Sequence, residues 1–347
     1  MASKRFILKR LLLLVPVLFG VATFVFVILH LASGDPARVI LGQRAPQSQV
    51  IQLRQELGLN DPLYVQYGRF LLEAAQFDFG ESYKIAQGET VRSVLADRIP
   101  VTLELSLYGQ VIGILLGIPL GVISAVKQDT LTDHVGRVGA LSGISIPIYW
   151  SGPMLILLFS TYLSIFPASG RIGSRIFLDN HWTLFGMQLP LTGMVTIDTL
   201  LLGEPVAWVS AVTHLFLPAM TIGIYSMALI SRMMRSSMLE VVRQDYMRTA
   251  RAKGQGSKIT IMKHGFRNAL IPVITVIGIQ FGGLLGGAVL TEPVFGIGGI
   301  GTMLVAAIGA NDYPLVQGTV LAFALLFTLV NLVVDITYSF LDPRIQQ

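Results

Sequence analysis

An all-α polytopic membrane protein with six transmembrane helices is the fold class that the sequence predicts. Hydrophobic residues make up 53% of its 347 residues and charged residues only 13%, about half the charged share of an average soluble domain. Six stretches without Asp, Glu, Lys or Arg are each long enough to cross a hydrocarbon core, which requires about 20 apolar residues. This composition excludes a disordered chain, a collagen-like chain and an ordinary soluble enzyme.

The six stretches differ in how well they fit a single straight helix. The first is too long for a cleaved signal peptide and has no convincing cleavage site. The third is longer than a span requires and contains Pro147 and Pro153. Another apolar stretch, Trp182–Gly203, is interrupted by Pro190 and Asp198, so we interpret it as an extracytoplasmic hairpin. The predicted spans are Leu11–Gly34, Leu105–Val126, Val138–Gly170, Pro205–Ser231, Asn268–Thr291 and Tyr313–Val334.

The distribution of basic residues predicts the orientation. A six-span topology with both termini in the cytoplasm places 16 of the 25 basic residues on the cytoplasmic side, which is the side that such residues favour. The net charge of +5 therefore reflects orientation in the membrane and not a nucleic-acid surface. Nine of the basic residues lie between the fourth and fifth spans: Arg232, Arg235, Arg243, Arg248, Arg251, Lys253, Lys258, Lys263 and Arg267.

A long first loop separates the first two spans. Ser48 is expected to cap one amphipathic helix of this loop, Pro62 to start another, and Thr90 to cap a third that ends before Pro100. We interpret the loop as a helical cap that also offers a docking surface. The predicted layout is an N-terminal cytoplasmic segment with the first span (1–32), an extracytoplasmic helical cap region (33–100), a core with the other five spans (101–340) and a cytoplasmic tail (341–347). Within the core we expect an extracytoplasmic insertion at about 171–204 and a cytoplasmic loop at 232–268.

Motifs for catalysis are absent from the sequence. It has no cysteine, and none of its five histidines has the His-Glu-x-x-His spacing of a zinc protease. Gly296–Gly301 matches the dinucleotide fingerprint Gly-x-Gly-x-x-Gly, but it follows a predicted span and lacks an acidic residue about 20 positions on, so we interpret it as a turn. No phosphate-binding loop is present either. We expect no catalytic residue, metal or cofactor in this chain, and keep a self-contained membrane enzyme or channel as the alternative class.

The loop between the fourth and fifth spans carries the most specific pattern. Asp245 is expected to cap a short basic helix, Gly254–Gly256 to end it, and Ser257 to cap the next helix, which leads through His264 into the fifth span. Such a helix is either a lipid-facing anchor, because basic residues favour anionic headgroups, or a surface that fits a cleft on a soluble partner.

The sequence of this loop resembles that of a known protein family. Arg248-Thr-Ala-Arg-Ala-Lys-Gly254, followed by His264 and Arg267-Asn-Ala-Leu-Ile-Pro272, resembles the coupling loop of ABC importer inner-membrane permeases, in particular the dipeptide, oligopeptide and nickel branch. The general permease pattern has Glu-Ala-Ala where this chain has Arg-Thr-Ala, a departure that matches the peptide branch. The resemblance covers almost the whole chain and includes Leu31–Ala37, Leu57–Leu63, Asp78–Ser82, Arg98–Leu103, Glu292–Phe295, Gly299–Gly301 and Asn311–Gly318.

The resemblance implies a type I ABC importer permease fold, in the inner membrane of a prokaryote, within a larger machine. That machine has a second permease, related but distinct, two ATP-binding subunits that hold ATP and Mg, and an extracytoplasmic substrate-binding protein. The implied substrate is a di- or oligopeptide, with nickel chelates and oligosaccharides as alternatives. The residues expected to couple to the ATPase are Asp245, Tyr246, Arg248, Thr249, Ala250, Arg251, Lys253 and Gly254.

Four glycines cluster in the fifth predicted span. Small residues let helices approach closely in lipid, so the cluster serves either helix packing or the translocation path. These glycines are Gly282, Gly283, Gly286 and Gly287.

Overall fold

The structure is a computed structural model, and it describes residues 4–32, 35–42, 44–179, 181–184 and 187–341. Within these residues, five helices are long and apolar enough to cross a membrane, and a bent helix pair is a sixth candidate. Internal contacts divide the chain into two compact units. Unit 1 is Val101–Ile297 with the part of the chain from Val330 onward, and unit 2 is Lys4–Pro100 with Gly298–Leu329.

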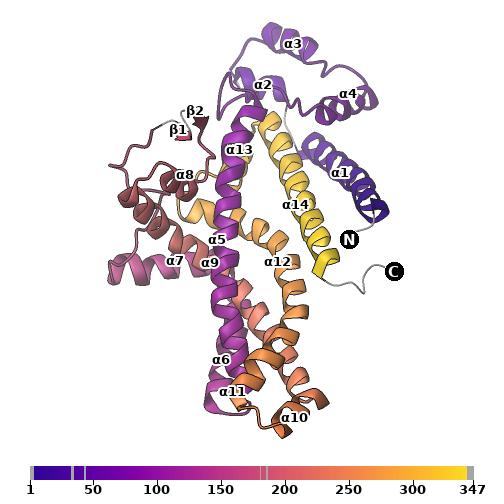
Figure 1. Cartoon of the computed structure of the whole chain (residues 1–347). Coiled ribbons are helices and arrows are strands. Elements are labelled where there is room, and N and C mark those ends of the chain that lie inside the picture. The colour runs from indigo at the N-terminus through magenta and orange to yellow at the C-terminus, as the bar shows by residue number, and fades with distance from the viewer. Residues whose placement is uncertain (1–3, 33–34, 43, 180, 185–186, 342–347) are drawn as a thin grey trace. The chain divides into compact units, whose positions relative to one another are not determined.

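The elements follow one another along the chain as labelled in Figure 1. They are α1 (Lys4–Ala32), α2 (Pro36–Leu41), α3 (Gln47–Glu56), α4 (Leu63–Ala75), α5 (Val91–Val126), α6 (Leu131–Ser145), α7 (Ile148–Leu155) with the π-helical turns Ile156–Tyr162, β1 (His181–Leu184), β2 (Met187–Pro190), α8 (Val195–Leu201), α9 (Pro205–Val242), α10 (Asp245–Ala252), α11 (Ser257–Ile259) with the π-helical turns Thr260–Phe266, α12 (Arg267–Val294), α13 (Ile300–Ala310) and α14 (Tyr313–Leu341).

Unit 2 is held together by apolar side chains on its helices. The apolar residues of α4 pack on α1, where the Phe26 ring lies 5.1 Å from that of Tyr67 and 5.7 Å from that of Phe70, measured between centroids. A second cluster joins the start of α5 to α13 and α14, with Leu315 and Ala307 fully buried. Ring pairs at such distances contribute stability beyond that of the apolar area that they bury.

The expected helix boundaries of unit 2 are correct in part. Pro62 immediately precedes α4, and the Thr90 hydroxyl accepts a hydrogen bond from the Ser93 amide at 3.3 Å, as expected of a cap. Ser48 does not cap α3, because the extended residue before that helix is Pro46. The helix that follows Thr90 does not end before Pro100 but continues to Val126, since an apolar environment offers the backbone no other hydrogen-bond partners.

Glycines at every fourth position let α5 pack directly on α9 in unit 1. They are Gly109, Gly113, Gly117 and Gly121, and a Cβ added at any of them would collide with α9. At Gly113 that Cβ would lie 2.6 Å from the Ser226 hydroxyl oxygen, and at Gly121 it would lie 2.6 Å from the Ser231 carbonyl oxygen. Close backbone approach through small residues is how helices associate where the solvent is lipid. Together, α5 and α9 form the framework of unit 1.

The third predicted span, Val138–Gly170, is not one straight helix but falls on the bent helix pair. Here α6 ends at Ser145, Ile146 is extended with ψ 122°, and Pro147 precedes α7. The two helices meet at 110°. The cause is Pro147, which disfavours the helical conformation in the residue before it.

The insertion near residues 171–204 contains the expected hairpin. Strands β1 and β2 pair antiparallel, with His181 opposite Pro190 and Trp182 opposite Leu189. The Trp182 indole N–H donates to the Pro190 carbonyl at 3.0 Å. The short helix α8 follows and packs against α9. No helix over Trp182–Gly203 qualifies as a span among the described residues, which agrees with its exclusion from the predicted spans.

Candidate coupling segment and its frame

The connecting segment, which we define as residues 243–266, joins α9 to α12 at one end of unit 1 (Figure 1). It begins where α9 stops at Val242. Arg243 closes that helix, with its amide bonded to the Glu240 and Val241 carbonyls. Gln244 then adopts an extended conformation with ψ 151°, and α10 starts at Asp245. This two-residue turn separates a long buried helix from a short exposed one.

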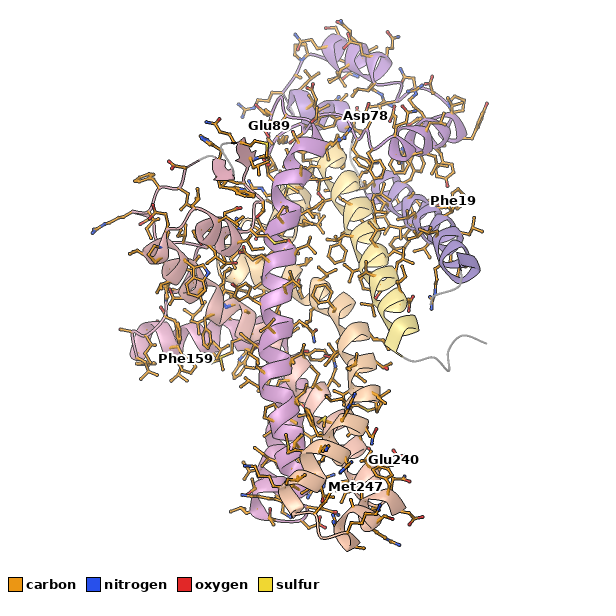
Figure 2. The ribbon with its side chains drawn as sticks, viewed as in Figure 1. Phe19, Asp78, Glu89, Phe159, Glu240 and Met247 are labelled. Carbon is orange, nitrogen blue, oxygen red and sulfur yellow. The ribbon has the colours of Figure 1, made fainter. Side chains whose placement is uncertain are left out.

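Helix α10 is anchored through a single apolar side chain. Met247 is fully buried, whereas most other side chains of the helix are exposed. Gly265 leaves room for it, because a Cβ at Gly265 would lie 3.3 Å from the Met247 methyl carbon and 3.7 Å from that of Met238. Met247 lies at the tip of unit 1 in Figure 2. An eight-residue helix is marginal on its own, so this contact and the favourable placement of Asp245 and Arg251 at its two ends support it.

Polar contacts hold the connecting segment loosely. The Asn268 side-chain amide donates to the Tyr246 hydroxyl at 3.2 Å, and a His264 ring nitrogen lies 2.9 Å from the Gln255 side-chain oxygen. Arg248 and Asp245 are 3.7 Å apart, but their side chains are 75% and 96% exposed. Exposed pairs of this kind contribute little to stability. The segment thus presents charged side chains that remain available to another molecule.

A glycine turn ends α10. Gly254 has φ +78°, a conformation that side chains with a Cβ disfavour, and its amide donates to the Arg251 carbonyl at 3.0 Å. The Gln255 amide returns to the Ala250 carbonyl at 3.3 Å. Gly256, in contrast, has φ −58°. The expected sequence of helix, break and helix is therefore present, and Gly254 is the position that requires glycine.

The predicted coupling residues all lie on α10 or in the turn that follows it. All are exposed except Ala250, which is half-buried. Two expected caps are wrong: Gln244 and not Asp245 precedes α10, and Gly256 and not Ser257 precedes α11. Asp245 and Ser257 are the first residues of their helices, because the residue before each of them already has the extended conformation of a cap. Met247 was not expected from the sequence, although it is the one large non-aromatic apolar residue in that helix.

The four glycines of α12 do not act as one group. Gly282 and Gly287 are buried, and a Cβ at Gly287 would meet Ile222 at 3.4 Å and Ile148 at 3.5 Å. Gly283 and Gly286 are exposed, with nothing within 4 Å of an added Cβ. Packing thus accounts for Gly287, while the exposed pair lies on another face of the helix.

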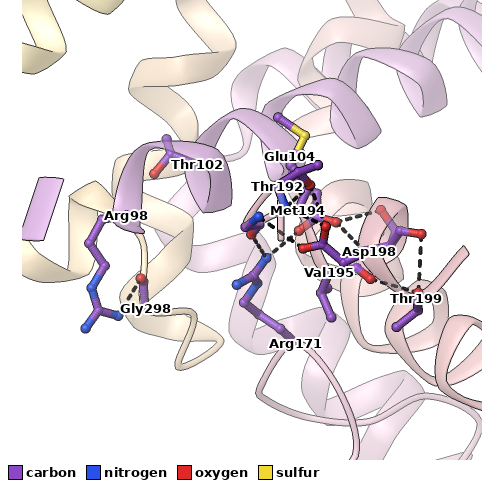
Figure 3. A network of polar contacts seen from close by, with 12 residues as sticks. Arg98, Thr102, Glu104, Arg171, Thr192, Met194, Val195, Asp198, Thr199 and Gly298 are labelled. Carbon is purple, nitrogen blue, oxygen red and sulfur yellow. Dashed lines mark hydrogen bonds and ion pairs between the residues drawn. The ribbon is translucent and has the colours of Figure 1, made fainter. Parts of the chain in front are cut away.

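Buried polar groups hold the other end of unit 1. Figure 3 shows the Glu104 carboxylate, which is 1% exposed. It accepts hydrogen bonds from the Thr196 amide at 2.7 Å, the Thr196 hydroxyl at 2.6 Å and the Arg171 guanidinium at 2.7 Å. Arg171 also donates to the Gly193 carbonyl at 2.7 Å. The 171–204 segment is in this way fixed to α5 by charge-assisted bonds, which are the stronger kind.

Asp198 closes the same segment on itself. Its buried carboxylate accepts from the Thr192 amide at 2.7 Å, the Thr192 hydroxyl at 2.8 Å and the Gly193 amide at 3.0 Å. These contacts fix the turn between β2 and α8. Sequence reasoning did not find Glu104 as a partner of Arg171 or Thr196, because these residues lie 67 and 92 positions away. Asp198 was noted only as an interruption of an apolar stretch, although its partners lie five and six positions away.

Unit 2 contains a comparable buried carboxylate, Asp312. It accepts from the Ser82 hydroxyl at 2.6 Å and from the backbone amides of Tyr83, Lys84 and Ile85 at 3.1, 2.9 and 3.0 Å. Burial opposes ionisation of Asp312, but the bonds from Ser82 and these amides outweigh burial and lower its pKa. Asp312 therefore fixes the loop before α5 to the loop before α14.

These features together define a class of protein. Five or six apolar stretches are long enough to span a membrane, an exposed, charged helix lies beyond the end of a long span, and no cluster of metal-ligating side chains occurs within the described residues. That arrangement is typical of a membrane transport subunit that docks a soluble partner. The chain belongs to the family of binding-protein-dependent transport system inner membrane components, which matches residues 117–347, and the N-terminal component of that family matches residues 3–106.

Similar proteins extend over the whole chain. The dipeptide transport system permease protein DppB of Escherichia coli K12 is 42% identical over 344 residues, which is 99% of this chain and 98% of the relative. The di/tripeptide permease DppB of Pseudomonas aeruginosa is 44% identical over 342 residues, 98% of each chain. The glutathione transport system permease protein GsiC of Salmonella choleraesuis is 37% identical over 341 residues, again 98% of each.

A solved structure shows the same fold. The chain aligns with the MetNI methionine ABC transporter with a TM-score of 0.52 and 15% identity, over 72% of this chain and 97% of that chain. The expectation of an ABC importer permease in the inner membrane is confirmed by this fold together with the family. The chain is a transport subunit and not an enzyme, and permeases of this family work with ATPase subunits and binding proteins.

Proposed function

We propose that this permease forms the path for di- and oligopeptides that an extracytoplasmic substrate-binding protein delivers. The observation that carries the proposal is its similarity, at 40–44% identity over at least 98% of the chain, to permeases named for dipeptides or di/tripeptides. A second permease, related but distinct, completes the path. Two ATP-binding subunits hold the ATP and Mg and hydrolyse the ATP. Both termini of this chain lie in the cytoplasm.

Helix α10 is the proposed contact with an ATP-binding subunit. Its exposed side chains Tyr246, Arg248, Thr249, Arg251 and Lys253 would enter a cleft on that subunit, and closure of the ATPase pair would displace the helix. The weak contacts of α10 with the rest of the chain support this role, because a surface that changes partners in each cycle must keep its side chains free of strong bonds within its own chain. The anchor at Met247 passes the displacement to α9 and α12. The spans then alternate between inward-facing and outward-facing states.

The test is uptake by the reconstituted transporter. The permease, its partner permease, the ATPase subunits and the binding protein are placed in liposomes, and uptake of a labelled dipeptide, a nickel chelate and an oligosaccharide is compared. We expect ATP-dependent uptake of the dipeptide only. Uptake of the nickel chelate or the oligosaccharide in its place would identify an alternative substrate, and uptake without any ATPase subunit would favour a channel.

The coupling role needs a separate readout. Arg248→Glu with Arg251→Glu reverses two charges on α10, and we expect the ATPase subunits to be lost from the purified complex. The matched control is Lys258→Glu with Lys263→Glu, which reverses two exposed charges in the same connecting segment. If both double variants retain the ATPase subunits, α10 does not form the contact.

A further inference from the structure

A cavity of about 720 Å³ lies between α5, α6 and α9 in unit 1. It is close to the end of α9 that leads into the connecting segment, since its lining reaches Arg243 and Gln244. One wall is apolar and another is basic. The apolar wall consists of Leu120, Ala140, Leu141, Ile144, Ala228 and Leu239, and the basic wall consists of Arg137, Arg232, Arg235 and Arg243.

One of the four arginines is neutralised within the protein. Arg235 forms two bonds of 2.7 Å with the carboxylate of Asp133, which is fully buried. Asp133 also accepts from the Ser124 hydroxyl and from the Asp129 amide. Such a bidentate, fully bonded pair is a fixed part of the site. It joins α6 to α9, and its arginine lines the cavity.

The other arginines are less well compensated. Arg137 forms a longer ion pair of 3.7 Å with the same Asp133 carboxylate, and one of its terminal nitrogens lies 2.7 Å from a His134 ring nitrogen, while its Nε atom is buried without a hydrogen bond among the described residues. Arg232 and Arg243 are exposed and form no side-chain bond with the described part of the chain. Glu240 is the acidic residue in the lining. The cavity therefore has an excess of positive charge facing its open volume.

The outer face of α6 shows what surrounds the cavity. Leu131, Val135, Val138 and Leu141 lie along one side of this helix and are 58–78% exposed. Four large apolar residues on one helix face indicate contact with hydrocarbon and not with water. Leu141 belongs both to this face and to the cavity wall. A molecule could thus place acyl chains along α6 and an anionic group between the arginines.

We propose that this cavity binds the headgroup of an anionic phospholipid from the cytoplasmic leaflet. Arg137, Arg232 and Arg243 supply the positive charge that attracts the headgroup, and the acyl chains continue along the exposed face of α6. Basic pockets between helices on the cytoplasmic side are suited to such headgroups. A guanidinium also matches the geometry of phosphate oxygens. The site differs from the proposed ATPase contact, because none of its residues lies on α10.

The test measures lipid retained by the complete transporter in detergent, by native mass spectrometry, with phosphatidylglycerol and phosphatidylcholine as probes. We expect the wild-type complex to retain phosphatidylglycerol preferentially. Arg232→Gln with Arg243→Gln should weaken that binding by about tenfold or more. The control is Lys258→Gln with Lys263→Gln, which removes the same charge from the same side and should leave binding unchanged. Arg232→Lys with Arg243→Lys keeps both positive charges and should therefore retain part of the binding. This comparison separates the loss of charge from a folding defect in the glutamine variant.

Several outcomes would overturn the proposal. Equal loss in the lysine control would show that binding follows general surface charge. Competition by inorganic phosphate as strong as by phosphatidylglycerol would show an anion site without lipid specificity. Competition by a dipeptide would show that the cavity takes the carboxylate of a substrate instead. The absence of bound lipid from the wild-type complex would show that the cavity does not take a phospholipid. None of these readouts uses transport, so they are independent of the proposed peptide substrate.

Discussion

The 171–204 segment and the connecting segment are attached to the framework of unit 1 by opposite means. Glu104, Arg171 and Thr196 tie the first to α5 through short, charge-assisted bonds with a carboxylate that is 1% exposed. The second depends on one buried methionine and on exposed polar pairs. The difference shows which segment is held in one geometry by buried bonds and which segment leaves its charged side chains exposed.

Glu104→Ala is expected to have the largest effect on the better-held segment. It leaves Arg171 and Thr196 without their acceptor in a buried site, and the loss of one member of a buried ion pair costs about 3 kcal/mol of unfolding free energy. Chemical unfolding of the purified complex measures this loss. Glu204→Ala is the control, because Glu204 is exposed and immediately precedes α9. Equal stability of the two variants would contradict the role given to Glu104.

Asp312→Asn extends the comparison to unit 2, with an expected loss of about 2 kcal/mol, because an amide accepts the bonds from Ser82 and three backbone amides less strongly than a carboxylate does. The effect should depend on pH. The folded pKa of Asp312 lies below its ordinary value of 3.8, so its contribution is complete above that value and is lost as the pH falls through the folded pKa. The stability difference between wild type and Asp312→Asn, measured by unfolding from pH 7 downward, should stay constant to about pH 5 and then shrink. A difference that grows on acidification would contradict this sign.

Gly254→Ala should have a smaller effect that is confined to the connecting segment. At φ +78° an added Cβ costs about 1–2 kcal/mol, although no atom blocks it. Gly256→Ala is the matched change, since that glycine has φ −58° and equally open surroundings. Amide hydrogen exchange across α10 should rise for Gly254→Ala only. Equal exchange in both variants would mean that the conformation of Gly254 does not hold the turn.

Arg248→Ala should have the smallest effect on stability. Its contact with Asp245 joins two highly exposed side chains at 3.7 Å, and such pairs contribute little or nothing measurable. Thermal unfolding of the isolated subunit should therefore not change, whereas retention of the ATPase subunits should fall if α10 is the contact. A clear drop in unfolding temperature would show that this pair is structural.

The sequence predicted the spans well because apolar runs of this length have few alternatives to a membrane helix. It also placed the break at Gly254, since the glycine signal is local. The repeat of glycines from Gly109 to Gly121 was present in the sequence but was not used, and the structure shows it as the contact between α5 and α9. Local signals were less reliable for caps, as Asp245 and Ser257 each lie one residue inside the helix that they were expected to cap.

The buried networks could not be predicted in the same way. Glu104 meets Thr196 and Arg171, and Asp312 meets Ser82, across separations of 92, 67 and 230 positions. A single carboxylate in a sequence does not identify its distant partner, because any Thr, Ser or Arg brought near by the fold could serve. Pro147, in contrast, is a local signal. It was noted in the sequence, but the bend that it causes between α6 and α7 was not predicted.

The length of α9 has a mechanical consequence. Its 38 residues run from Pro205 to Val242 and include Pro218, and they correspond to roughly 57 Å at 1.5 Å per residue. A helix of that length that tilts as one body by about 5° displaces its end by about 5 Å, close to one helical turn. If α10 is the contact with an ATP-binding subunit, a tilt of α9 by a few degrees would therefore be enough to move α10 by about half the diameter of a helix.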